Sequence, residues 1–139
     1  MTVPTLLIDF PPLGHPDHSA RATLLGHQWP VMWVVGNNFF RPISTLGIFG
    51  YGFAAWAARG GGLKGDWRLY ALGAACHLST VVHSAINMQP LNDQLDRLSV
   101  SEDKTKAVQL ARDWVKCNKW RIFFPFVAGS AALWQACLV

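Results

Sequence analysis

Charged residues are scarce in this chain of 139 residues. Asp, Glu, Lys and Arg make up 14% of the sequence and hydrophobic residues 51%, whereas about a quarter of an average globular protein is charged. This balance excludes intrinsic disorder, which requires few apolar residues and many charges. It also disfavours an ordinary water-soluble domain, because so few charged side chains cover little of a surface.

Several motifs that build common functional sites are also missing. The three cysteines form no Cys-x-x-Cys pair, which argues against a disulfide framework and against a structural zinc site. The sequence has no phosphate-binding loop, no Gly-x-Ser-x-Gly and no His-Glu-x-x-His. No basic patch is interleaved with aromatic residues in a soluble module, so nucleic acid is not an expected partner. The first residues lack the basic start and apolar centre of a signal peptide.

Four long stretches contain no charged residue at all. They are 22–40, 42–58, 69–92 and 122–139, with 19, 17, 24 and 18 residues. A helix needs about 17–25 mainly apolar residues to cross a bilayer. The sequence therefore predicts an all-α fold, an integral-membrane helical bundle with three or four apolar helices. The alternative is a soluble protein whose helices are unusually buried.

The first two stretches differ in how well they fit a membrane-spanning helix. Stretch 42–58 should begin a helix, with Pro42 in the first turn. Gly47 and Gly50 leave one face of that helix smooth enough for close contact with another helix. Stretch 22–40 is interrupted by polar residues, and it either spans the membrane or lies in the interface, where its tryptophans would face lipid headgroups.

The remaining sequence defines the predicted domain organisation. Residues 1–21 are expected to form an N-terminal tail, and residues 22–139 a membrane helical-bundle domain. A polar helical segment at about 93–121 carries seven basic and five acidic residues. Ser99 and Glu102 have the spacing of a capping box, so a helix should start near them and continue into the last apolar stretch.

Polar side chains within stretch 69–92 require an explanation. Cys76, Thr80, His83 and Asn87 recur at helical spacing and should share one face, and Pro90 should end the helix. Amide and imidazole groups are costly when they face lipid, so this face should look into a bundle or a cavity. The small residues are expected to bridge neighbouring helices, whereas His83 and Asn87 are candidates either for such contacts or for a functional site.

A second polar cluster lies where the last apolar helix begins. Trp114, Asn118 and Arg121 are spaced i, i+4, i+7 and therefore share a helix face. Arg121 is either an anchor that snorkels to the membrane interface or a functional group. Asn118 is either solvated or part of a pocket.

These residues also carry a family resemblance. The segments concerned are Asn87-x-x-Pro90-x-Asn92, Trp114-x-x-x-Asn118-x-x-Arg121 and Gln28-Trp29-x-x-Met32-Trp33. From about residue 22 to its end, the chain resembles the anthrone oxygenases, a family of small fungal integral-membrane proteins first catalogued as a domain of unknown function. The resemblance also implies a further apolar helix ahead of the Gln-Trp segment.

The resemblance implies a membrane-bound monooxygenase that uses dioxygen to convert a polyketide anthrone to an anthraquinone in secondary-metabolite biosynthesis. Dioxygen would be a co-substrate, with no other cofactor and no metal. The expected partners are an aromatic polyketide substrate and the lipid bilayer. The expected location is a multi-pass position in an intracellular membrane such as the endoplasmic reticulum. The sequence leaves the oligomeric state undefined.

The same resemblance suggests roles for individual residues. His83 would be the catalytic base, because an imidazole works near neutral pH, and Arg121 would stabilise the developing enolate charge. The expected substrate-binding residues are Asn87, Asn92, Trp114, Asn118 and Trp33. Two alternatives remain open: a cofactor-free cyclase or other tailoring enzyme of the same kind of pathway, and a non-catalytic membrane adaptor.

Overall fold

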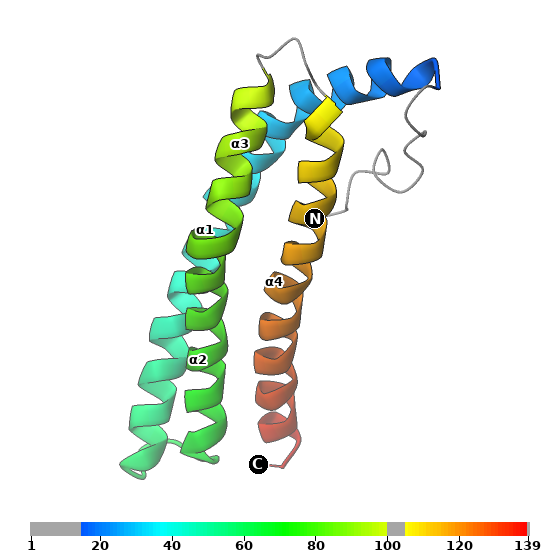
Figure 1. Cartoon of the computed structure of the whole chain (residues 1–139). Coiled ribbons are helices and arrows are strands. Elements are labelled where there is room, and N and C mark those ends of the chain that lie inside the picture. Colours follow the sequence, from blue (N-terminus) through cyan, green and yellow to red (C-terminus); the bar gives the residue numbers. More distant parts are fainter. Residues whose placement is uncertain (1–14, 100–104, 139) are drawn as a thin grey trace. The chain divides into compact units, whose positions relative to one another are not determined.

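The computed structural model describes residues 15–99 and 105–138, and all secondary structure in these residues is helical. The elements are α1 (Asp17–Arg59), α2 (Trp67–His83), the π-helical segment η2 (Ser84–Met88), α3 (Gln89–Ser99) and α4 (Thr105–Leu138) (Figure 1). The predicted all-α class is therefore confirmed. The predicted capping box lies partly outside the described residues, because they do not include Glu102.

Helix α1 continues through the boundary that was expected between two separate apolar stretches. It begins at Asp17, within the predicted tail, and runs for 43 residues. The prediction that Pro42 starts a new helix is wrong, because Pro42 lies well inside α1. A proline inside a helix deprives the carbonyl four residues earlier of its partner. That carbonyl belongs to Asn38, an exposed residue, which limits the cost of burying an unpaired group.

The prediction that Pro90 ends a helix is also wrong. Pro90 is the second residue of α3, and η2 joins α3 to α2 without a break in the helical backbone. A π turn contains an extra residue, which gives room for a proline ring that would otherwise collide with the carbonyl four residues earlier. The wider turn also shifts the helical register. Thr80 before it is buried, whereas Asn87 within it is exposed.

The described residues contain one helix that is long and apolar enough to cross a membrane. It comprises the 31 residues Trp67–Arg97, with a mean hydropathy of 1.3 over its most apolar window. The predicted bundle of three or four membrane helices is not confirmed. The glycines, asparagines and prolines within α1 lower its mean hydropathy, although the helix is long.

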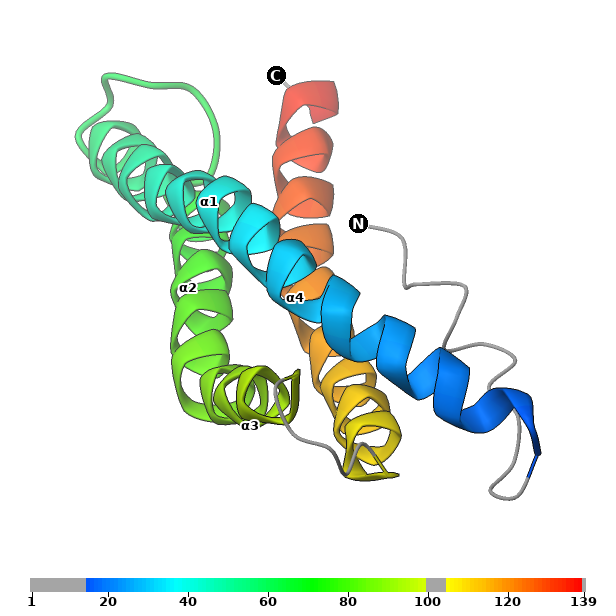
Figure 2. The ribbon, with the colours of Figure 1, turned by 90° about the horizontal axis from the view of Figure 1, so that it is seen from above.

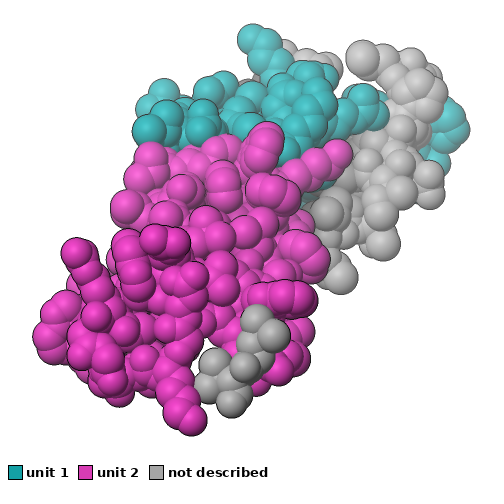
Figure 3. Space-filling model, turned by 90° about the horizontal axis from the view of Figure 1, so that it is seen from below, with its two compact units in different colours: residues 1–38, 86–118 teal, residues 39–85, 119–139 magenta. Residues whose placement is uncertain are grey.

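The chain divides into two compact units (Figure 3). Unit 1 contains the described residues of 1–38 and 86–118, and unit 2 contains those of 39–85 and 119–139. Helices α1 and α4 each contribute one part to each unit.

A helical hairpin forms much of unit 2. Helices α1 and α2 run antiparallel, joined by the glycine-rich loop 60–66 (Figures 1 and 2). Gly61 and Gly65 have φ values of 77° and 110°, a region that side chains with a Cβ rarely adopt. Asp66 begins α2 as its N-cap, because its carboxylate accepts the Arg68 N–H at 2.9 Å.

Two rings pack reciprocally against two glycines in this hairpin. The His77 ring of α2 covers Gly47 of α1, and the Tyr51 ring of α1 covers Gly73 of α2. The two rings stack on each other with centroids 5.5 Å apart. The predicted close helix contact is thus confirmed at Gly47, whereas no atom lies within 4 Å of a Cβ placed at Gly50.

Unit 1 has its own hydrophobic core. Helix α1 contributes Ala22, Leu25 and Trp29, the segment from η2 to α3 contributes Met88 and Leu95, and α4 contributes Val108, Ala111 and Trp114. This core buries one face of α1, including Trp29, which was expected to face lipid headgroups if stretch 22–40 lay in the membrane interface.

Candidate functional site

Two predicted site residues form a buried pair in unit 1. The Trp114 indole Nε1–H of α4 donates a 2.8 Å hydrogen bond to the Asn92 carboxamide Oδ1 of α3. Both residues are buried. An unpaired amide or indole would be costly in such a place, so the bond orients both side chains and joins the two helices.

Trp29 belongs to the same cluster, although it was not among the predicted site residues. Its ring meets the Trp114 ring edge to face, with centroids 5.1 Å apart and planes at 90°. Ala22, Leu25 and Trp29 are spaced i, i+3, i+7. This periodicity is the signal that could have placed Trp29 in the core.

A small cavity lies beside this cluster. It has a volume of about 40 Å³ and is lined by Trp29, Pro30 and Trp33 of α1 and by Asn92, Asp93 and Asp96 of α3. The structure thus brings Trp33 and Asn92 together at one cavity, and their role in substrate binding remains a prediction. The Nε1 atoms of both tryptophans are buried and have no hydrogen-bond partner within the described part of the chain.

The two other predicted asparagines also lie in unit 1. Asn118 is half-buried on α4, one helical turn after Trp114. Asn87 lies in η2 and is exposed. The π turn explains this position, because it takes Asn87 out of the register that the buried Thr80 follows. Its role in substrate binding remains a prediction.

The two predicted catalytic residues lie in unit 2. His83 is the last residue of α2, is half-buried and directly precedes the π turn. π turns inside helices often occur at functional sites. The half-buried Arg121 places its guanidinium carbon 5.7 Å from the centre of the Phe40 ring, within the range of a cation–π contact. The catalytic roles of both residues remain predictions.

An exposed acidic residue of unit 1 illustrates the electrostatics of α4. Asp113 accepts hydrogen bonds from Lys116 at 3.2 Å and from Gln109 at 3.2 and 3.3 Å. The hydrogen bond from Lys116, then that from Gln109, lowers the pKa of the Asp113 carboxyl below its usual value. Asp113 therefore remains ionised at neutral pH and belongs to a surface network on the polar half of α4.

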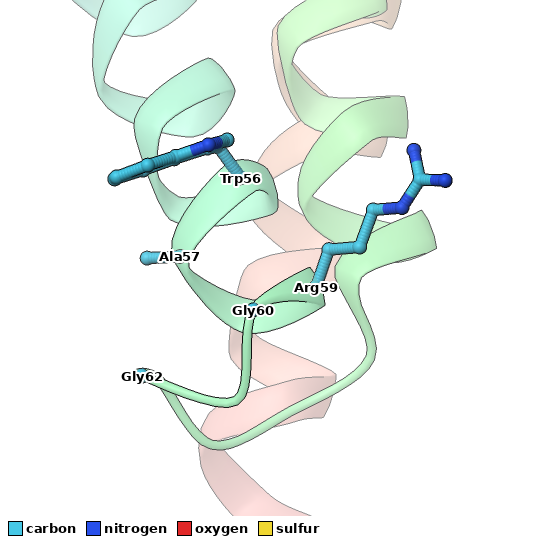
Figure 4. Close-up of a pocket in the computed structure, with 5 residues that line it drawn as sticks. All are labelled: Trp56, Ala57, Arg59, Gly60 and Gly62. Atoms are coloured by element: carbon cyan, nitrogen blue, oxygen red, sulfur yellow. The ribbon is translucent and has the colours of Figure 1, made fainter.

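A larger hollow occurs at the end of α1, away from the predicted residues. It measures about 550 Å³ and is lined by Trp56, Ala57, Arg59, Gly60 and Gly62 (Figure 4). Trp56 and Arg59 project to opposite sides of the helix end. The Arg59 guanidinium lies 5.4 Å from the centre of the Trp67 ring. Among the described residues that line this hollow, Arg59 is the only one with an ionisable side chain.

Within residues 15–99 and 105–138, no group of three or more His, Cys, Asp or Glu residues could hold a metal ion. The polar groups of the unit 1 site are indoles, an amide and two carboxylates. They suit hydrogen bonding to an organic ligand.

Comparison with protein families gives a match to the family described as anthrone oxygenase, over residues 29–131. The matched span covers well over half of the chain and contains every predicted site residue. No curated protein and no solved structure gives a match.

Proposed function

The chain belongs to the anthrone oxygenase family, and from this premise we propose that it is a membrane-bound oxygenase that converts a polyketide anthrone to an anthraquinone. In this reaction the methylene carbon of the anthrone becomes a carbonyl. One atom of dioxygen enters the product and the other leaves as water. The substrate supplies all the electrons, so no external reductant is required. The family match over residues 29–131 is the observation that carries this proposal.

The first step would be removal of a proton from the methylene carbon. His83 is the proposed base, because imidazole can accept a proton near neutral pH. The resulting carbanion is stabilised as an enolate and reacts with dioxygen to give a hydroperoxide. Loss of water from the hydroperoxide then forms the quinone carbonyl. The position of His83 beside a π turn supports a functional role.

Arg121 would stabilise the negative charge of the enolate. Its guanidinium is half-buried over the apolar face of Phe40. A fixed cation in surroundings of low dielectric stabilises a developing anion far more than it would in water.

The residues of unit 1 would hold the substrate. The hydrogen bond between Trp114 and Asn92 restrains both side chains, and restrained groups lose less entropy when a ligand binds. Trp33 lines the same cavity as Asn92. Asn118 and Asn87 are the proposed partners of the carbonyl and phenolic oxygens.

Exposed apolar side chains support a membrane location for unit 2. Leu46, Phe49, Phe53 and Trp56 on α1 are each about two-thirds exposed or more, as is Phe126 on α4. Large exposed apolar surfaces mark contacts with lipid or with other proteins, and helix Trp67–Arg97 is apolar enough to span a bilayer. An intracellular membrane such as the endoplasmic reticulum would suit an apolar aromatic substrate.

The experiment incubates the purified full chain in detergent with an anthrone, under ¹⁸O₂ and under argon. We expect dioxygen uptake above the spontaneous rate and one ¹⁸O atom in the new carbonyl. Uptake at the spontaneous rate would refute the proposal. Turnover of a different substrate under argon would indicate a cyclase, and no turnover of either kind would indicate an adaptor.

The proposed base is tested by one substitution and a matched control. His83→Gln should lower turnover by about 10²-fold or more. His27→Gln alters an exposed histidine of α1 and should leave turnover unchanged. Wild-type turnover in His83→Gln would remove His83 from this role.

A further inference from the structure

The small cavity of unit 1 contains an unusual pair of hydrogen-bond donors. Trp29 and Trp33 lie one turn apart on α1, and each lines the cavity. Trp29 is only 2% exposed, and neither indole Nε1–H has a hydrogen-bond partner within the described residues. Buried donors of this kind are rare and costly in native proteins. A ligand that supplies an acceptor atom would remove that cost.

The residues that α3 contributes to the cavity carry acceptor oxygens. Asn92, Asp93 and Asp96 of α3 line it, and the Oδ1 atom of Asn92 already accepts the Trp114 indole N–H. Asp93 and Asp96 lie three residues apart, hence on one face of α3. Indole N–H groups can only donate hydrogen bonds, and ionised carboxylates can only accept them. A group that satisfies both the indoles and the carboxylates must accept and donate at the same time.

We propose that this cavity binds a phenolic hydroxyl group of the substrate, with the Trp29 and Trp33 indoles donating hydrogen bonds to its oxygen and the α3 carboxylates accepting a hydrogen bond from its O–H. The proposal rests on the proposed function for the identity of the aromatic ligand. It assigns Trp29, Asp93 and Asp96 to substrate recognition, beside Trp33.

The size of the cavity supports a single functional group. A volume of about 40 Å³ holds one or a few water-sized groups, and drug-sized ligands occupy about 300 Å³ or more. Only one substituted edge of a three-ring substrate can therefore enter, while its rings remain outside.

The negative charge of Asp93 and Asp96 should make the cavity select a neutral substituent over an anionic one. Two carboxylates in the lining repel an anionic substituent, and the cost is about 1 kcal/mol at 4 Å even in water. A ligand with a neutral hydroxyl should therefore bind better than one with a carboxylate at the same ring position. A ligand without either group should leave both indole donors unsatisfied.

Binding can be measured without turnover, on the full chain in detergent micelles. The probes are 2-hydroxyanthraquinone, unsubstituted anthraquinone and anthraquinone-2-carboxylate, at a pH at which the phenol is protonated. The chain has seven tryptophans, and single Trp→Phe replacements assign their indole ¹⁵N–H resonances. The hydroxylated probe should shift the Trp29 and Trp33 resonances downfield, relative to the shifts caused by anthraquinone. The exposed Trp134 should not change.

Two sets of variants test the indoles and the carboxylates. Trp33→Phe should weaken binding of 2-hydroxyanthraquinone by about 3–10-fold, the value of one hydrogen bond, and binding of anthraquinone by less than twofold. The control Trp120→Phe alters an exposed tryptophan of α4 and should change neither. Asp93→Asn with Asp96→Asn should improve binding of the carboxylate probe by about fivefold, whereas Asp113→Asn should not.

The outcomes separate this inference from the proposed function. Anthrone turnover without a hydroxyl-specific shift of the two indole resonances would overturn the inference and leave the oxygenase activity intact. A hydroxyl-specific shift in a chain that consumes no dioxygen would support the inference and refute the activity. Equal affinity for the hydroxyl and carboxylate probes would contradict the inference, since the carboxylates of Asp93 and Asp96 would then not face the ligand.

Discussion

The substitution Gly47→Ala should weaken the α1–α2 hairpin. An added Cβ would lie 2.6 Å from Nδ1 of His77 and 2.7 Å from its Cδ2 and Cε1. Three ring atoms at nearly equal distances mean that the new methyl group meets the face of the ring. The ring would have to move away bodily, but the Tyr51 ring stacks against it, and Tyr51 is itself packed on Gly73.

Gly50→Ala is the matched control for this experiment. Both glycines lie in α1, and each substitution gains about 1 kcal/mol of helix propensity. Nothing lies within 4 Å of a Cβ at Gly50, so that variant should be more stable than wild type. Overpacking at Gly47 costs about 1–3 kcal/mol. Because the propensity term cancels in the comparison, Gly47→Ala should be about 1–3 kcal/mol less stable than Gly50→Ala.

The assay is reversible denaturation of the full chain in detergent, followed by helical circular dichroism. Repeating the pair of substitutions in a His77→Ala background completes a double-mutant cycle. The difference between the two glycine variants should disappear there, because the ring that causes the collision is gone. Equal stability of the two variants with His77 present would refute the packing described for this hairpin.

Three further predictions concern other contacts. Asn92→Ala leaves the buried Trp114 indole without its acceptor and should cost about 1–3 kcal/mol in the free energy of unfolding; an unchanged value would mean that the bond is not formed. Gln135→Ala removes two hydrogen bonds to the Asp66 backbone, of 2.6 and 3.1 Å, so the Asp66 amide should exchange with deuterium faster, while amides in the middle of α4 serve as controls. The Asp113 carboxyl should titrate by NMR below its ordinary value of 3.8. Because the pKa of the Asp113 carboxyl is lower in the folded state than in the unfolded state, this group stabilises the fold fully at pH values above its unfolded-state pKa. That stabilisation is lost as the pH falls through the lowered, folded-state pKa. A midpoint at or above 3.8 would contradict the network around it.

Local sequence patterns predicted some contacts of the candidate site and missed others. Asn92 and Trp114 were predicted to bind substrate, and the structure joins them by a hydrogen bond. One of the two predictions for stretch 22–40 placed Trp29 at the membrane interface, because tryptophans are frequent there. The spacing of Ala22, Leu25 and Trp29 indicates a buried face, and the packing of α3 and α4 against it buries Trp29 in the core of unit 1.

The register errors have one physical cause. Helical spacing predicts a common face only when every turn has 3.6 residues. The π turn at 84–88 breaks this periodicity, so Asn87 departs from the face that it would share with Thr80. A proline inside a helical pattern usually ends the helix, which is why Pro90 was expected to do so. Here the wide π turn before Pro90 lets the helix continue.

The amino-acid sequence by itself determined the all-helical class and the family, because apolar periodicity and short motifs are local properties of the chain. The tertiary structure alone decided which indole N–H groups are buried without a partner among the described residues, which acidic residues line the same cavity, and that His77 fills the space above Gly47. These features arise from pairs of residues far apart in the chain, such as Trp33 with Asp96 and His77 with Gly47. Whether two such residues come into contact depends on how the helices pack, and a local sequence pattern does not determine that packing.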